Sequence, residues 1–69
     1  MALKKRSFTL SGHRTSVALE PEFWAVLEES AQSAGSLAGL VARIDRERGE
    51  QPLASALRLA ALAAAKSGP

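Results

Sequence analysis

The first regular pattern along the chain is an alternation of apolar and polar or small side chains over His13–Leu19. In an extended strand, alternate residues point to opposite faces. The two faces would carry Thr15, Val17 and Leu19, and Arg14, Ser16 and Ala18, respectively. Pro21 follows at once, and proline suits the first turn of a helix because its missing N–H needs no partner there. The pattern predicts a short strand that runs directly into a helix.

The segment before this strand also alternates, but in the opposite parity. Phe8 and Leu10 occupy even positions, whereas Val17 and Leu19 occupy odd ones. One continuous strand would put the two apolar pairs on opposite faces, so a turn or bulge is expected at Gly12. Residues 7–10 then form either a second strand or an arm packed elsewhere.

A lone strand at His13–Leu19 would leave its backbone N–H and C=O groups unpaired, which is costly in a buried setting. The simplest partner is the same strand from a second copy of the chain. We therefore expect a homodimer joined through an intermolecular antiparallel pair of strands, with no stable folded monomer. Its expected core consists of Val17, Leu19, Phe23, Trp24, Leu40, Val41 and Ile44.

Three helices are predicted after the strand, over residues 21–34, 37–48 and 53–66, because apolar residues recur at helical spacing. Gly35 is expected to end the first helix, and Ser36 to cap the N-terminus of the second. Gly39 lowers the helix propensity of the second helix. We expect it to allow two backbones to approach closely across the dimer axis.

The third helix carries two apolar stripes rather than one. The first contains Leu53, Leu57 and Ala60, and the second contains Leu59, Leu62 and Ala63. A helix that is apolar on two sides is expected to be covered on two sides. We therefore expect 53–65 to contact a partner chain, in a dimer or a higher oligomer. Arg58 is the only charge inside this stretch, and an ion pair with Asp45 or Glu47 is expected.

Length and composition favour the same assembly. A chain of 69 residues without cysteine has a small core and no disulfide to support it, so dimerisation is the remaining source of burial. The N-terminal residues resemble no signal peptide, and a cytoplasmic location is expected. A single histidine and no cysteine provide no evident metal site, and no cofactor is expected. The apolar stretch 53–65 is too short to span a membrane.

Positive charge is concentrated at the N-terminus. Residues 1–19 contain Lys4, Lys5, Arg6 and Arg14 and no acidic residue, whereas residues 20–69 contain five basic and seven acidic residues. A basic segment on a mildly acidic body suits a polyanion such as nucleic acid. A solvated, flexible N-terminus is the alternative explanation. His13 is either a phosphate contact or a hydrogen-bonded turn residue.

The order of strand, helix, Gly-Ser junction and helix resembles the ribbon-helix-helix family of dimeric DNA-binding proteins. Residues 5–24 are similar to a small bacterial subgroup of that family, and Ile44-Asp45 and residues 53–58 match later parts of the same pattern. The resemblance implies a mostly α fold in which one short strand per chain forms the intermolecular ribbon. The third helix, and the N-terminal strand if it forms, are additions to that fold.

The resemblance also implies where DNA would be contacted. The ribbon would enter the major groove with Arg14, Ser16 and Ala18 toward the base edges. The start of the second helix, at Ser36 and Leu37, would hold a phosphate. The basic N-terminal residues and His13 would contact further phosphates.

We expect residues 1–12 to form a basic arm or extra strand, 13–66 the ribbon-helix-helix domain, and 67–69 a tail. The expected function is a sequence-specific DNA-binding dimer that regulates transcription as a repressor. The alternative is a protein-interaction or oligomerisation module on the same fold, with weak or no DNA binding. An enzyme ranks last, because the chain has one histidine, no cysteine and no pair of carboxylates on a convincing pocket-forming element.

Overall fold

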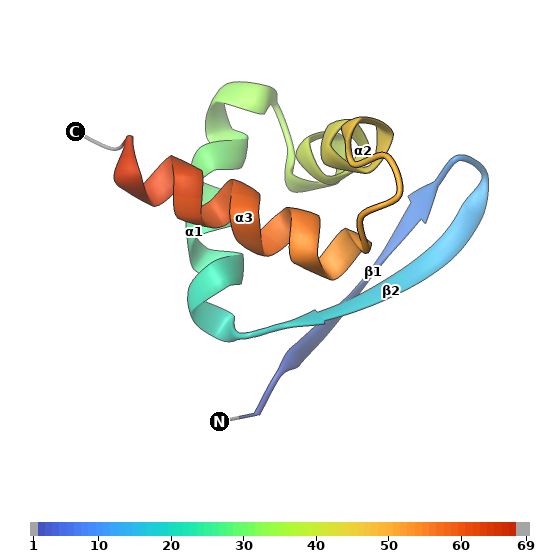
Figure 1. The fold of residues 1–69 in the computed structure, drawn as a ribbon, viewed down its shortest axis with the longest axis horizontal. Coiled ribbons are helices and arrows are strands. Elements are labelled where there is room, and N and C mark those ends of the chain that lie inside the picture. The colour runs from blue at the N-terminus through green and yellow to red at the C-terminus, as the bar shows by residue number, and fades with distance from the viewer. Residues whose placement is uncertain (1, 68–69) are drawn as a thin grey trace.

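The N-terminal part of the chain is a β-hairpin, here called the ribbon. In the computed structural model, which describes residues 2–67, strands β1 (Lys4–Leu10) and β2 (His13–Leu19) pair antiparallel in a two-stranded sheet (Figure 1). Ser11 and Gly12 join them, with φ angles of 52° and 81°. Positive φ at both central residues is typical of the type I′ turn, whose twist matches that of the flanking strands.

Within one chain, β2 takes β1 as its partner at one edge, and its other edge stays open among residues 2–67, so the expected pairing with a second chain stays a prediction. All seven residues of β2 pair with β1 of the same chain, from Leu10 opposite His13 to Lys4 opposite Leu19. The two-residue turn places β1 beside β2 at little entropic cost, because closing a short loop fixes few residues. Residues 7–10 were expected to form either an additional strand or an arm packed elsewhere, and the structure shows the strand. This strand, β1, begins at Lys4, three residues before the alternating segment.

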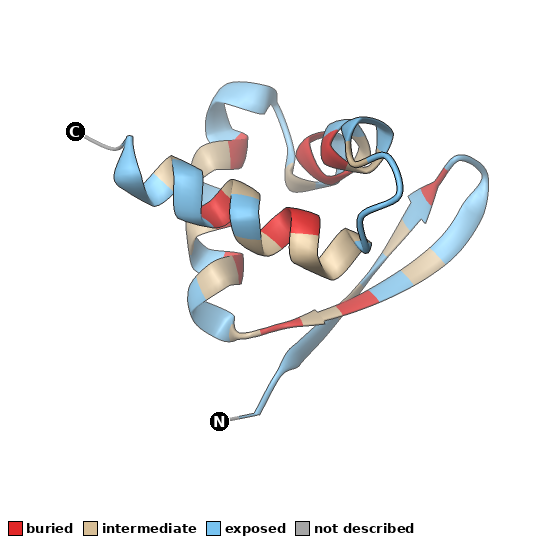
Figure 2. Cartoon of the chain, viewed as in Figure 1, coloured by how far each residue is buried: buried red, intermediate tan, exposed pale blue. Residues whose placement is uncertain are grey.

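The hairpin also explains the change of parity between the two alternating segments. Its register pairs even residues of β1 with odd residues of β2, so both apolar sets share one face. Leu10, Val17 and Leu19 are buried on this inner face, and Phe8 packs against the core. Arg14 and Ser16 are exposed on the outer face and Ala18 is half-buried, as the alternation predicts (Figure 2).

Three helices lie together to one side of the ribbon (Figure 1): α1 (Pro21–Ala34), α2 (Leu37–Glu47) and α3 (Leu53–Lys66). These bounds match the predicted helices, except that α2 ends one residue earlier because Arg48 is its C-terminal cap. Gly35, with φ of 97°, ends α1 in a conformation that favours glycine. Of the predicted tail, Ser67 donates its N–H to the Ala63 carbonyl, and residues 68–69 lie outside the described residues.

Gly39 has a local role at the start of α2, and its expected place at a dimer axis stays a prediction. The Ser36 hydroxyl accepts a hydrogen bond from the Gly39 N–H at 3.0 Å, which caps α2. A Cβ atom at Gly39 would lie 3.1 Å from the Ser36 Oγ. Glycine therefore leaves room for the capping hydroxyl, and its close neighbour belongs to the same chain.

A single chain closes its own hydrophobic core. Of the residues expected in a dimer core, all but Phe23 are buried within one chain, and Phe23 packs against them half-buried. Leu27, Ala31, Ala56, Leu57 and Ala61 complete the buried set together with Leu10. The core thus fills the space between the inner face of the ribbon and the three helices.

Trp24 attaches α1 to the ribbon. Its indole N–H donates a hydrogen bond of 2.7 Å to the Lys4 carbonyl, and its ring lies 5.9 Å from that of Phe8. The side chain is 2% exposed, so the N–H would be costly to bury without this acceptor. The contact fixes β1 against the helices at the end of the ribbon opposite the turn.

The partner of Arg58 is neither Asp45 nor Glu47, the two residues expected. Arg58 donates to the Glu20 carboxylate at 3.0 Å and lies over the Phe23 ring, whereas Asp45 pairs with Arg48. Glu20 directly precedes α1, so the ion pair joins the start of α1 to α3. A backbone hydrogen bond at Glu20, and then the Arg58 guanidinium, lower the pKa of the Glu20 carboxyl.

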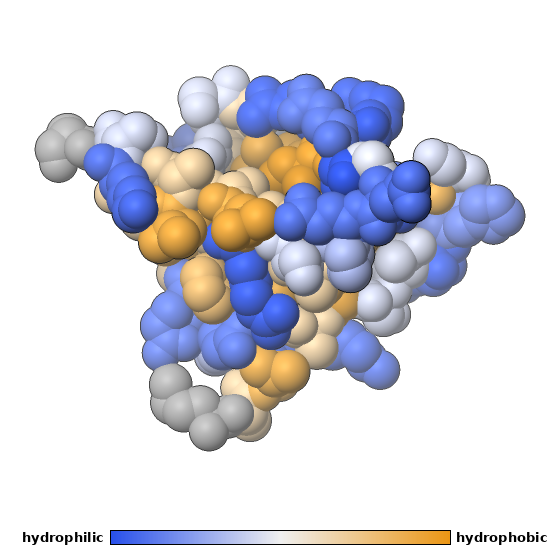
Figure 3. Space-filling view, viewed as in Figure 1, coloured by the Kyte–Doolittle hydropathy of each residue, from blue (hydrophilic) through white to orange (hydrophobic). Residues whose placement is uncertain are grey.

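Only one of the two apolar stripes on α3 is covered. In the first stripe Leu57 is buried and Leu53 and Ala60 are half-buried against the core, whereas Leu59 and Leu62 of the second are 55% and 48% exposed. Figure 3 shows the corresponding hydrophobic atoms gathered on the surface along α3. The second stripe therefore remains accessible to a partner.

We expect Val17→Ala to lower the free energy of unfolding by about 1–3 kcal/mol, because it removes buried methyl groups and leaves a small cavity. Arg14→Ala, which alters the outer face of the same strand, should change it by less than about 0.5 kcal/mol. Urea unfolding followed by circular dichroism measures both. Equal losses in the two variants would contradict the assignment of the two faces.

The lowered pKa of Glu20 predicts a pH-dependent contribution to stability. A carboxyl with a depressed folded pKa stabilises above its unfolded pKa, about 4.3, and loses that effect as the pH falls through the folded pKa. The stability difference between the wild type and Glu20→Gln should therefore be present at pH 7 and shrink below about pH 4. Urea unfolding at pH 7 and pH 3 tests this, with Glu50→Gln as an exposed control. A difference that stays constant with pH would refute it.

Candidate nucleic-acid interface

The outer face of the ribbon is a polar surface built by both strands. Register places its six side chains in three cross-strand pairs: Lys5 with Ala18, Ser7 with Ser16, and Thr9 with Arg14. All are exposed except the half-buried Ala18. The hydroxyls of Ser7 and Ser16 lie 2.9 Å apart and share a hydrogen bond across the centre of the face. The outer face thus presents hydrogen-bonding groups and two cations, and no acid.

Its charge is not neutralised within the part of the chain that the structure describes. Neither Lys5 nor Arg14 has an ion-pair partner there, and residues 1–19 contain no carboxylate. Lys4 and His13 are exposed at opposite ends of the ribbon. An exposed cationic strip of this kind attracts a polyanion.

Arg6, one of the residues predicted to contact phosphate, faces the helices instead. Its guanidinium lies 3.2 Å from the Glu28 carboxylate and 5.4 Å from the centre of the Trp24 ring. Strand alternation places Arg6 on the inner face, between Lys5 and Ser7 of the outer face. Its interactions within the chain hold β1 on α1.

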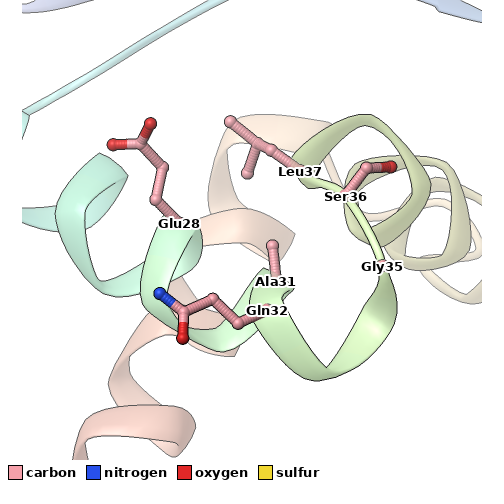
Figure 4. A pocket seen from close by; sticks show the side chains of 6 residues that line it. All are labelled: Glu28, Ala31, Gln32, Gly35, Ser36 and Leu37. Atoms are coloured by element: carbon pink, nitrogen blue, oxygen red, sulfur yellow. The ribbon is translucent and has the colours of Figure 1, made fainter.

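The other predicted phosphate site, at Ser36 and Leu37, lies beside a shallow hollow of about 230 Å³ between α1 and α2. Figure 4 shows Glu28 and Gln32 of α1 on one side of it and Leu37 of α2 on the other. The Ser36 hydroxyl already caps Gly39, so an anion would meet the backbone N–H groups of the first turn. Glu28 adds a carboxylate to this lining, and no cation lines it.

The structure brings together the three predicted base contacts, Arg14, Ser16 and Ala18, and adds residues that sequence reasoning missed. Ser7 and Thr9 were assigned no role, and Lys5 was placed among the phosphate contacts. All three lie on the outer face because β1 pairs with β2. One sequence feature could have placed these three residues on the outer face. It is the alternation before Gly12 together with a two-residue turn, because the two define the register of a hairpin.

Other kinds of site find little support in residues 2–67. No group of three or more His, Cys, Asp or Glu residues is arranged there to hold a metal ion. None of the helices described is both long and apolar enough to cross a membrane.

Comparison with known families identifies one match. The family model described as the ribbon-helix-helix domain matches residues 3–65, which include both strands, α1, α2 and nearly all of α3. Neither the curated proteins nor the solved structures contain a match to this chain.

Proposed function

Because this chain belongs to the ribbon-helix-helix domain family, whose members generally bind DNA in transcription regulation, we propose that it is a sequence-specific DNA-binding repressor. The observation that carries the proposal is the outer face of the ribbon: exposed, free of acidic groups, and lined by Lys5, Arg14 and three hydroxyls. The family consists of DNA-binding regulators rather than enzymes.

A two-stranded ribbon has suitable dimensions for this task. The major groove is about 12 Å wide and admits an α-helix or a two-stranded β-ribbon. In the proposed complex the outer face meets the base edges, where arginine and lysine contact guanine and serine donates or accepts a hydrogen bond. The helices remain outside the groove because they all lie to one side of the ribbon (Figure 1).

Phosphate contacts would fix the position of the ribbon. Lys4 and His13 lie exposed at the two ends of the ribbon, opposite Leu19 and Leu10 on the inner face, and would contact phosphates beyond the ends of the outer face. The first-turn N–H groups of α2, at Ser36 and Leu37, offer a further anion contact at the positive end of the helix dipole. Contacts of this type orient a protein on DNA without selecting a sequence.

A second candidate function is an oligomerisation module, which the exposed stripe on α3 favours. Family members typically bind DNA as dimers. We propose that a second copy of this chain covers Leu59 and Leu62. The neighbouring Ala63 is small enough for two such helices to approach closely. This contact is separate from the expected ribbon interface, for which the edge of β2 that faces away from β1 remains open among residues 2–67.

Binding to genomic DNA fragments, measured by gel shift at several salt concentrations, tests the proposed function. The logarithm of the affinity should fall with the logarithm of salt by roughly 0.9 per phosphate neutralised. Lys4→Ala should reduce that slope by about 1 and leave the preferred sequence unchanged. Lys66→Ala, which removes an exposed cation at the end of α3, is the matched control and should not alter the slope. Absence of binding at low salt would refute the proposal.

Sedimentation equilibrium tests the α3 interface. The wild type should form dimers at micromolar concentration, and the double change Leu59→Ser and Leu62→Ser should weaken association at least tenfold, about 1.4 kcal/mol. Leu3→Ser is the control, because Leu3 is also half-exposed but lies outside α3. A wild-type protein that stays monomeric, or a Leu3 variant that loses association equally, would exclude this interface.

A further inference from the structure

From the two edges of the ribbon we propose that β1 lies along a wall of the major groove, where Lys5, Ser7 and Thr9 contact the sugar-phosphate backbone. The base edges are then left to β2. This inference rests on the proposed function and on the expected pairing of β2 with a second copy of the chain. It narrows the proposed complex, because only the β2 half of the outer face reads bases and the β1 half contacts the DNA backbone.

The two free edges of the ribbon differ in how they are protected. β1 begins with the cations Lys4-Lys5-Arg6, and lysines on an edge strand discourage pairing with another chain. Trp24 and Glu28 of α1 also hold β1 in place. β2 contains no lysine or proline, and its open edge offers the backbone groups of seven residues. A second copy is therefore expected at the edge of β2 rather than at that of β1.

Pairing within the chain also determines which residues of β2 meet the second copy. In a hairpin with a two-residue turn, the residues that flank the turn form a hydrogen-bonded pair, and such pairs alternate with unbonded ones. The pair at this turn is Leu10 and His13, so odd-numbered residues of β2 direct their backbone groups to β1. Arg14, Ser16 and Ala18 direct theirs to the open edge. Full antiparallel overlap of two β2 strands then places Ser16 opposite Ser16 of the second copy, on the twofold axis.

The resulting sheet has four strands, and its width decides what each strand can reach. Strands lie about 4.8 Å apart, so the two β1 backbones lie roughly 7 Å on either side of the axis. The major groove is about 12 Å wide, which puts its walls about 6 Å from the same axis. The two β2 backbones, each about 2.4 Å from the axis, fit inside the groove. Each β1 strand therefore lies at a wall, and each wall receives one copy.

The outer side chains of β1 have the chemistry that a phosphate wall requires. Lysine binds phosphate as a point charge, so Lys5 suits this position. The hydroxyls of Ser7 and Thr9 can donate hydrogen bonds to phosphate oxygens, and all three side chains are exposed. Arg14 lies on β2, and arginine forms two parallel hydrogen bonds to guanine. The cation suited to bases thus lies inside the groove, and the cation suited to phosphates lies at its wall.

The first test selects binding sequences from a random duplex library with the full chain. Affinity for the selected duplex and for its single-base variants is then measured at several salt concentrations. Lys5→Ala should reduce the slope of log affinity against log salt by roughly 1.8, because each of two chains loses a phosphate contact worth roughly 0.9. Its base preferences should stay unchanged, since phosphate contacts carry no sequence information. Ser7→Lys, which adds a cation at the same wall, should steepen the slope by a similar amount.

Two further variants serve as controls. Arg14→Ala should relax base preference by roughly 5- to 150-fold. Arg46→Ala, which removes an exposed cation from the last turn of α2, should alter neither the slope nor the preference. Circular dichroism of each variant confirms that the ribbon still forms.

The outcomes separate this inference from the function on which it rests. If Lys5→Ala relaxes base preference, β1 lies within the groove, and the inference is wrong although DNA binding stands. If Lys5→Ala changes neither the preference nor the slope, β1 lies away from the DNA, and the inference is equally wrong. If the wild type binds no duplex, the proposed function fails and the inference fails with it.

Single cysteines test the pairing on which this geometry depends, because the chain has no cysteine of its own. The Ser7 and Ser16 hydroxyls lie 2.9 Å apart on the outer face, but only Ser16 is expected on the twofold axis. Under mild oxidation Ser16→Cys should form a disulfide-linked dimer, since Cα atoms of a hydrogen-bonded pair lie about 5.5 Å apart. Ser7→Cys is the matched control and should form none, because its two copies would lie roughly 14 Å apart. Any other pattern would exclude the four-stranded sheet, and the inference with it.

Discussion

The turn at Ser11 and Gly12 is the constraint on which the structure depends. With only two residues in the loop, Leu10 must face His13, and every other pair along the ribbon follows from that one. A slip of one residue would put the apolar residues of the two strands on opposite faces, so that either Leu10 or the pair Val17 and Leu19 would leave the core. The same geometry therefore determines which residues stabilise the chain and which are available to a partner.

The helices hold the ribbon by contacts at its far end. Trp24 combines a buried ring, a satisfied indole N–H and a guanidinium stacked on its face. Arg58 bridges the start of α1 to α3. These contacts allow a chain without disulfides to keep a two-stranded sheet in place, although such a hairpin is marginal in isolation. They also show how residues 2–67 can form a hydrophobic core within one chain.

Local patterns predicted much of this fold. The three helices, the glycine that ends α1, the serine cap of α2 and the two faces of β2 all follow from periodicity or backbone preference. The N-terminal strand was only one of two alternatives for residues 7–10, because three consecutive cations, Lys4-Lys5-Arg6, obscure the start of β1. Ion-pair partners such as Glu20 for Arg58 depend on how helices pack, and sequence spacing does not determine that. The missed residues of the outer face, Ser7 and Thr9, follow from the same hidden strand.

The two faces of the ribbon have a consequence for how such a protein can diverge. Substitutions on the outer face, as at Ser7 or Thr9, remove no buried contact and cost little stability. Substitutions at Val17 or Leu19 disturb the core. A lineage can therefore exchange the exposed side chains while the scaffold is retained, which separates the inheritance of the surface from that of the fold.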